Sequence, residues 1–150
     1  KKFDISEDRL IFATRTSPPE HLARHRHADL FLDTLPYNAG ATASDALWAG
    51  LPVLTCMGES FASRVASSLL YAIGLPELVT DTQSDYEALA IELGNNPSKV
   101  RALKDKLEKN RLNTPLFDTQ RFTKNIEAAY TKMYDRYHSD LPPDHIYIDP

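Results

Sequence analysis

Cysteine is almost absent from the 150-residue sequence: Cys56 is the single one, so no disulfide can form within the chain. This excludes the disulfide framework of small secreted domains, and we expect a cytoplasmic protein. Cys56 follows apolar residues, and there a cysteine is far more often a small buried hydrophobe than a nucleophile. No apolar run reaches the length of a membrane-spanning helix and no signal-peptide pattern opens the chain, so we expect no membrane partner.

The chain also lacks a G-x-G-x-x-G motif after any apolar stretch, which argues against a dinucleotide-dependent enzyme such as a dehydrogenase. The net charge is −4, with Lys and Arg dispersed along the chain, and this argues against a nucleic-acid partner. We find no internal repeat and no low-complexity segment. A hydrophobic content of 42% in a chain of this length is sufficient for one domain with a sizeable core.

The most informative stretch is ADLFLDTLPYNAGATASDALWAGLPVLTCM, residues 28–57. It predicts a strand over Leu30–Asp33, a turn rich in Pro, Asn and Gly, a short helix over Ala46–Ala49 that Gly50 ends, and a strand over Val53–Thr55. In such a βαβ unit, ligands bind beyond the carboxyl ends of the strands, where a helix N-terminus offers free N–H groups to a phosphate. The same pattern also occurs in ordinary α/β turns, so spacing alone leaves both interpretations open.

The rest of the chain predicts further strands at Leu10–Ala13 and Glu77–Thr80, giving an α/β fold with a parallel sheet of about four strands flanked by helices. Because a complete doubly wound sheet has more strands, we expect an open edge that could support self-association. The expected helices begin with Pro19–His25 and with Phe61–Ile73, which has one apolar stripe through Phe61, Val65 and Leu69 and ends at Gly74. They continue with Ser84–Leu93 before Gly94 and with a helix from Pro97 that turns Val100, Leu103 and Leu107 inward. The last is Thr119–His138, capped by Asp118 and followed by an irregular tail over residues 139–150. Trp48, in the short helix, is expected to be a packed residue.

Several separated motifs occur in a recognisable order: RLIFA, PPEHLAR, ADLFLDT, ASDALWAGLPVLT, GESFASRVA and PLFDTQRF. Together they resemble the C-terminal catalytic region of the bacterial-type O-GlcNAc transferase and Spindly-like glycosyltransferases, from about Arg9 to about Ile146. The resemblance implies a two-Rossmann-domain glycosyltransferase in which residues 1–150 are part of the C-terminal nucleotide-sugar-binding domain. It implies that the other catalytic half, with any catalytic base and any tetratricopeptide repeats, lies upstream. The implied reaction transfers a sugar from a donor of the UDP-GlcNAc type to Ser or Thr of protein acceptors without a metal cofactor.

At the N-terminus of the short helix, the backbone N–H groups of Ala41, Thr42 and Ala43 could bind a diphosphate, and the Thr42 hydroxyl could add a hydrogen bond. We therefore assign Gly40, Ala41 and Thr42 to a candidate nucleotide-sugar site. Asp45 lies about one turn further on. From the residues alone it fits a ribose-binding acid and a dipole-stabilising acid equally well, and the resemblance implies the ribose role.

His21 and Arg24 are three residues apart and share a face of the helix expected over Pro19–His25. The resemblance implies that this His lies beside the nucleotide and that the Arg reaches its base or phosphates. Without the resemblance, a solvated charged face is the simpler interpretation. His21 and His25 also have metal-ligand spacing, but no third ligand completes a site, so we predict no metal.

The turn departs from the family pattern, in which a His and a Thr occupy the positions of Gly40 and Ala41. Two further positions differ from the animal enzymes: Tyr37 stands where they have a smaller residue, and Pro18 stands where they have a Lys. Two alternatives to a UDP-GlcNAc enzyme therefore stay open: a GDP-fucose-dependent relative and a non-catalytic nucleotide-binding or scaffold module.

The resemblance also bears on the last helix, which in such transferases crosses back to the first domain. Without that domain, Phe122, Ile126 and Met133 are expected to be exposed or to bury themselves against a second copy of the chain.

Overall fold

Three short strands form a parallel sheet in the computed structural model, which describes residues 5–148. The strands are β1 (Phe31–Leu32), β2 (Val53–Cys56) and β3 (Val79–Thr80), and their order in the sheet is β1-β2-β3. Phe31 lies opposite Val53 in the first pair, and Thr55 lies opposite Val79 in the second. Residues 1–4 of the polar lead-in and residues 149–150 of the tail lie outside the described part.

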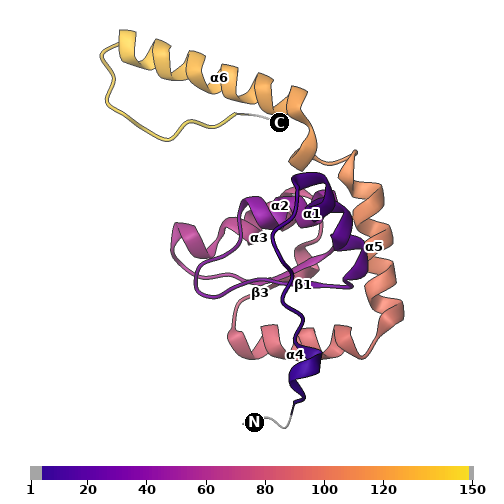
Figure 1. The fold of residues 1–150 in the computed structure, drawn as a ribbon. Helices are drawn as coiled ribbons and strands as arrows, with labels where there is room; N and C mark the ends of the chain where they lie inside the picture. The colour runs from indigo at the N-terminus through magenta and orange to yellow at the C-terminus, as the bar shows by residue number, and fades with distance from the viewer. Residues whose placement is uncertain (1–4, 149–150) are drawn as a thin grey trace.

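The described residues form six α-helices: α1 (Pro18–Arg24), α2 (Ala41–Trp48), α3 (Val65–Ala72), α4 (Gln83–Gly94), α5 (Pro97–Arg111) and α6 (Thr119–His138). The crossover helices α2 and α3 lie on one face of the sheet and α4 on the other, while α5 runs along one side of the body (Figure 1). The fold is thus the predicted α/β arrangement.

Two predicted helix ends are formed by glycine. Gly50 follows α2 with a φ of +85°, and Gly74 follows α3 with a φ of +75°, a backbone conformation that favours glycine. After α2, the N–H of Gly50 bonds to Leu47 O and that of Leu51 to Ala46 O, a Schellman motif that satisfies the last carbonyls of the helix.

The core lies between the sheet and the helices, and it consists almost entirely of aliphatic side chains. The helix α5 contributes the predicted stripe at i, i+3 and i+7, namely Val100, Leu103 and Leu107, all buried. The other large and fully buried side chains come from the sheet and from the helices beside it: Leu47, Val53, Leu54, Leu70, Ile73, Leu75, Leu78 and Leu93.

The predicted strand at Leu10–Ala13 is wrong, and the sheet has three strands rather than four. This segment has no regular structure, and Ile11 and Phe12 are 89% and 91% exposed. A short apolar run becomes a strand only when a neighbour satisfies its backbone hydrogen bonds. In the described residues, β1 pairs with β2 alone, and residues 10–13 do not occupy its open edge.

The single helix predicted over Phe61–Ile73 is also wrong in part. A 3-10 turn at Phe61–Ser63, which Ser60 caps, precedes α3. Of the predicted stripe, Phe61 does not reach the core and is 88% exposed, whereas Val65 and Leu69 are half-buried and Leu69 packs against the core. The fully buried apolar side chains of α3 are Ala66 and Leu70. The change of helix type rotates Phe61 out of register with the residues that follow it.

The last helix, α6, has the predicted bounds and the predicted cap, in which the Asp118 carboxylate accepts a hydrogen bond from the N–H of Arg121 at 2.9 Å. Figure 1 shows α6 extending away from the sheet, and the tail runs back along it. None of its residues is buried, and Phe122 and Met133 are among its exposed apolar side chains. No helix within residues 5–148 combines the length and apolar character needed to cross a membrane.

Candidate functional site

The loop between β1 and α2 is closed by the side chain of Asp33. This carboxylate is 4% exposed, and its Oδ1 accepts hydrogen bonds from the N–H of Thr34 at 2.8 Å and of Ala39 at 2.7 Å. One oxygen atom therefore joins the two ends of a six-residue loop. Because Ala39 directly precedes the cap residue of α2, this bond fixes where the helix begins.

The other side of Asp33 is held by two residues from distant parts of the chain. Thr55 in β2 donates its hydroxyl to Asp33 Oδ2 at 2.6 Å, and Tyr86 in α4 donates its hydroxyl to the backbone O of Asp33 at 2.9 Å. Burial, and to a lesser degree the charges of Asp33 and Cys56, raise the pKa of Tyr86 above its ordinary value of 10.0. The Tyr86 phenol therefore remains a hydrogen-bond donor throughout the neutral range.

At the N-terminus of α2, three backbone N–H groups have no partner among the described residues. The first helical bond is donated by Ser44 to Gly40 O, and no side chain caps the helix. The N–H groups of Ala41, Thr42 and Ala43 are therefore free. Ala41 and Thr42 are exposed. Such a terminus carries partial positive charge and favours an anion.

Gly40 does not have a positive φ, and its surroundings leave room for a Cβ atom. Its φ is −100°, and a Cβ atom at this position would lie 3.5 Å from Val65 Cγ1, an ordinary contact. Tyr37, earlier in the loop, is 74% exposed, and its backbone O accepts a hydrogen bond from the Thr34 hydroxyl.

Asp45 lies in the second turn of α2 and is half-buried, on the same helix as the free N–H groups.

The C-terminal end of α2 is held by Arg111 of α5, which donates to the backbone O of Trp48 at 2.8 Å. Trp48 packs edge-on against Phe117, as expected of a packed residue, although 45% of it is exposed. α2 is thus fixed at both ends.

His21 and Arg24 form a pair on α1. Arg24 Nη2 lies 2.6 Å from His21 Nδ1, and Arg24 Nη1 donates to the backbone O of Thr14 at 3.0 Å. The helix begins with Ser17, whose N–H and hydroxyl both bond to the Glu20 carboxylate. These bonds lower the pKa of Glu20.

The sequence-predicted residues thus fall into two groups, His21 with Arg24 on α1 and Gly40 to Asp45 at α2. In residues 5–148 no hydrogen bond joins the two groups. Three residues that shape the site were missed by the sequence analysis: Asp33, Thr55 and Tyr86. Asp33 alone had a local signal, an acid at the end of an apolar strand just before a Gly-containing turn.

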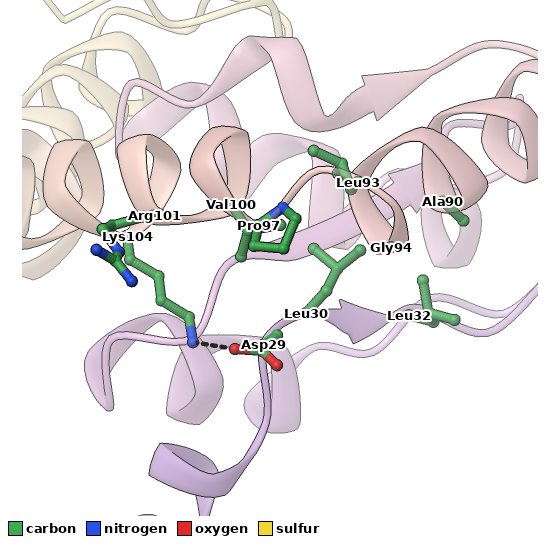
Figure 2. Close-up of a pocket in the computed structure, with 10 residues that line it drawn as sticks. All are labelled: Asp29, Leu30, Leu32, Ala90, Leu93, Gly94, Pro97, Val100, Arg101 and Lys104. Atoms are coloured by element: carbon green, nitrogen blue, oxygen red, sulfur yellow. Dashed lines mark hydrogen bonds and ion pairs between the residues drawn. The ribbon is translucent and has the colours of Figure 1, made fainter.

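A groove with a volume of about 450 Å³ lies elsewhere, between the β1 segment and the α4–α5 junction (Figure 2). Apolar side chains such as Leu30, Leu32 and Leu93 line it. At one end, Lys104 makes an ion pair with Asp29 at 2.9 Å. The groove contains none of the predicted site residues.

Within residues 5–148, no group of three or more His, Cys, Asp or Glu side chains is arranged so that it could hold a metal ion.

Comparisons with known proteins agree with this architecture. Residues 1–126 match the model of the family described as glycosyl transferase family 41. The chain is 37% identical over 142 residues to a UDP-N-acetylglucosamine–peptide N-acetylglucosaminyltransferase of Caenorhabditis elegans, covering 95% of this chain and 12% of that protein. It is 39% identical over 145 residues to the probable UDP-N-acetylglucosamine–peptide N-acetylglucosaminyltransferase SEC of Arabidopsis thaliana, covering 96% of this chain and 15% of that protein.

A solved structure, a mutant O-GlcNAc transferase of Thermobaculum terrenum, superposes with a TM-score of 0.80 and 36% identity over 85% of this chain and 24% of that chain. The resemblance predicted from the sequence motifs is thereby confirmed, and so is the fold. The chain spans between an eighth and a quarter of the length of these proteins. It belongs to glycosyl transferase family 41.

Proposed function

We propose that the chain is the nucleotide-sugar-binding part of a protein O-glycosyltransferase that transfers N-acetylglucosamine from UDP-GlcNAc to Ser or Thr of protein acceptors. The observation that carries the proposal is the free N-terminus of α2, held by Asp33 at the carboxyl end of β1 in a chain of this family. Relatives named as UDP-N-acetylglucosamine–peptide N-acetylglucosaminyltransferases support the donor and the acceptor class.

In this proposal the N–H groups of Ala41, Thr42 and Ala43 receive the diphosphate. Breaking the bond between the sugar and the diphosphate leaves negative charge on the leaving group, and fixed N–H dipoles stabilise that charge without rearrangement. Thr42 can add its hydroxyl, and Asp45 can accept hydrogen bonds from the ribose. The general base and the remaining diphosphate contacts come from the part of the enzyme outside this chain.

His21 and Arg24 are assigned to the uracil base and the phosphates. Their mutual contact at 2.6 Å orients both groups. Arg24 is further held by Thr14 O. A planar guanidinium fixed in this way suits a phosphate or a base edge.

A thermal-shift measurement on the full-length protein tests the proposal, with UDP, UDP-GlcNAc, UDP-glucose, GDP and GDP-fucose as ligands. Binding to the folded state raises the midpoint according to RT ln(1 + [L]/Kd), so the ligands can be ranked. We expect a rise with the uridine compounds alone. A rise confined to guanosine compounds would refute the UDP-sugar assignment, and no rise with any ligand would refute nucleotide binding.

Two variants locate the site within the protein. Asp45→Asn, which keeps the size of the side chain and removes its charge, should weaken UDP binding about tenfold if the ribose bond is charge-assisted. Asp105→Asn is the matched control, because Asp105 is exposed on α5. Equal UDP affinity in the two variants would exclude the ribose role of Asp45.

A further inference from the structure

The hydroxyl of Tyr86 lies at the end of a chain of contacts that leads to the N-terminus of α2. Tyr86 belongs to α4, on the face of the sheet opposite to α2 (Figure 1). It donates at 2.9 Å to the backbone O of Asp33, 53 positions earlier in the chain. The Asp33 carboxylate in turn holds the N–H of Ala39, next to the cap residue Gly40. A helix on one face of the sheet is therefore tied to a loop that begins a helix on the other face.

All three polar groups of Asp33, the backbone N–H, the backbone O and the carboxylate, are used in this arrangement. Its backbone N–H bonds to Leu54 O, its backbone O accepts from Tyr86, and its carboxylate accepts from Thr34, Ala39 and Thr55. Since β1 is only two residues long, the sheet alone gives Asp33 little support. The phenol restrains the residue at the point where the strand ends and the loop begins.

We propose that Tyr86 is a positioning residue for the nucleotide-sugar site: through Asp33 it sets the position of the loop and of the free N–H groups of α2 that face the diphosphate. The proposal rests on the proposed function. It deepens that function by placing control of donor affinity in α4, a helix that supplies none of the assigned ligand contacts.

Tyr86 acts on the site through geometry alone. A binding site has a higher affinity when its hydrogen-bond donors are already in place before the ligand arrives, because ordering the donors on binding costs conformational entropy. A small displacement of Asp33 shifts Ala39, and Ala39 is two residues from Ala41. Loss of the Tyr86 bond therefore leaves every assigned ligand group intact but less fixed.

The test is Tyr86→Phe in the full-length protein, which removes one hydroxyl and keeps the ring that packs beside the core. Tyr71→Phe is the matched control, because Tyr71 is 55% exposed on α3 and none of the hydrogen bonds in residues 5–148 uses its hydroxyl. Calorimetric titration with UDP should give a Kd that is about two- to tenfold higher for Tyr86→Phe, as expected for one hydrogen bond, and unchanged for Tyr71→Phe.

Two further readouts separate positioning from a general loss of structure. The KM for the donor should rise while the KM for an acceptor peptide stays constant. In the protein without ligand, amide hydrogen exchange at Thr34 and Ala39 should accelerate, whereas that of β2 should not. Equal UDP affinity of the two variants, with binding by the wild-type protein intact, would overturn the positioning role alone. Absence of UDP binding by the wild-type protein would overturn the proposed function and the positioning role with it.

Discussion

Thr55→Val should destabilise the chain more than its conservative chemistry suggests. Thr55 is fully buried in β2, and its hydroxyl is the partner of Asp33 Oδ2 at 2.6 Å. Valine has nearly the same shape, so the substitution opens no cavity and isolates the loss of the donor. Hydrogen bonds to charged groups contribute roughly 1.5–3 kcal/mol, and a buried carboxylate oxygen left without its donor retains its desolvation cost.

The comparison variant is Thr80→Val, in the neighbouring strand. The Thr80 hydroxyl donates at 3.0 Å to the backbone O of Thr55, a neutral acceptor, and Thr80 is 8% exposed. Loss of such a bond costs about 0.5–1.5 kcal/mol. The two variants thus differ mainly in the charge of the acceptor.

Thermal unfolding followed by circular dichroism measures the difference. For a chain of this length, 1 kcal/mol corresponds to roughly 2–4 °C in Tm. We expect Thr55→Val to lower Tm by roughly 3–12 °C and Thr80→Val by roughly 1–6 °C. When the two variants are measured in parallel, the decrease for Thr55→Val should be the larger one. If Thr55→Val costs no more stability than Thr80→Val, the Asp33 carboxylate does not depend on this donor, and the Thr55 hydroxyl does not hold the loop between β1 and α2.

Three further predictions concern the core, a tight turn and pH. Leu107→Ala should lower the free energy of unfolding by about 2–5 kcal/mol in a denaturant titration, because the side chain is fully buried, whereas Leu112→Ala, which is 75% exposed, should change it by less than about 0.5 kcal/mol. Gly58→Ala should lower the free energy of unfolding by about 1–3 kcal/mol in the same titration, because its Cβ would lie 2.5 Å from Ser63 Oγ and 2.8 Å from Ser63 Cβ. If the variant is as stable as the wild type, the turn can relax around the added methyl group. The raised pKa of Tyr86 means that its contribution to stability is fully present below about pH 10 and is lost as the pH rises through the folded-state value. The difference in unfolding free energy between the wild type and Tyr86→Phe should therefore be constant below pH 10 and shrink above it, and a difference that grew with pH would contradict the assignment.

Local patterns in the sequence predicted those parts of the fold that depend on local chemistry. Gly50 and Gly74 mark helix ends because only a residue without a Cβ adopts a positive φ cheaply. The stripe Val100, Leu103 and Leu107 predicts a buried helix face because its spacing matches the helical period.

The incorrect predictions concern segments whose structure depends on contacts with other parts of the chain. Residues 10–13 have the composition of a strand but no neighbouring strand in the described residues, and the backbone hydrogen bonds of a strand need one. Phe61 has helical spacing relative to Val65, but a 3-10 turn intervenes. In both cases the apolar residue is exposed although its pattern predicts burial.

The candidate site likewise has a part that local sequence predicts and a part that depends on long-range contacts. Gly40 to Asp45 are contiguous and could be found from a turn followed by a helix. The network that holds them could not, because Thr55 and Tyr86 lie 22 and 53 positions from Asp33 and nothing in their local sequence indicates a contact. Long-range hydrogen bonds appear only once the sheet has brought the strands and α4 together.

Because backbone groups form the proposed anion site, the turn can differ from the family pattern and still offer hydrogen-bond donors to an anion. At Gly40 and Ala41 the chain has lost an imidazole and a hydroxyl, yet the groups that we assign to the diphosphate are backbone N–H groups, which every residue except proline retains. Their direction depends on where α2 begins, and that is set by Asp33 below the loop and by Arg111 at the far end of the helix. Substitutions within the loop should therefore alter donor affinity less than substitutions in Asp33, Thr55 or Tyr86, which never touch the ligand in the proposed arrangement but hold the helix that does.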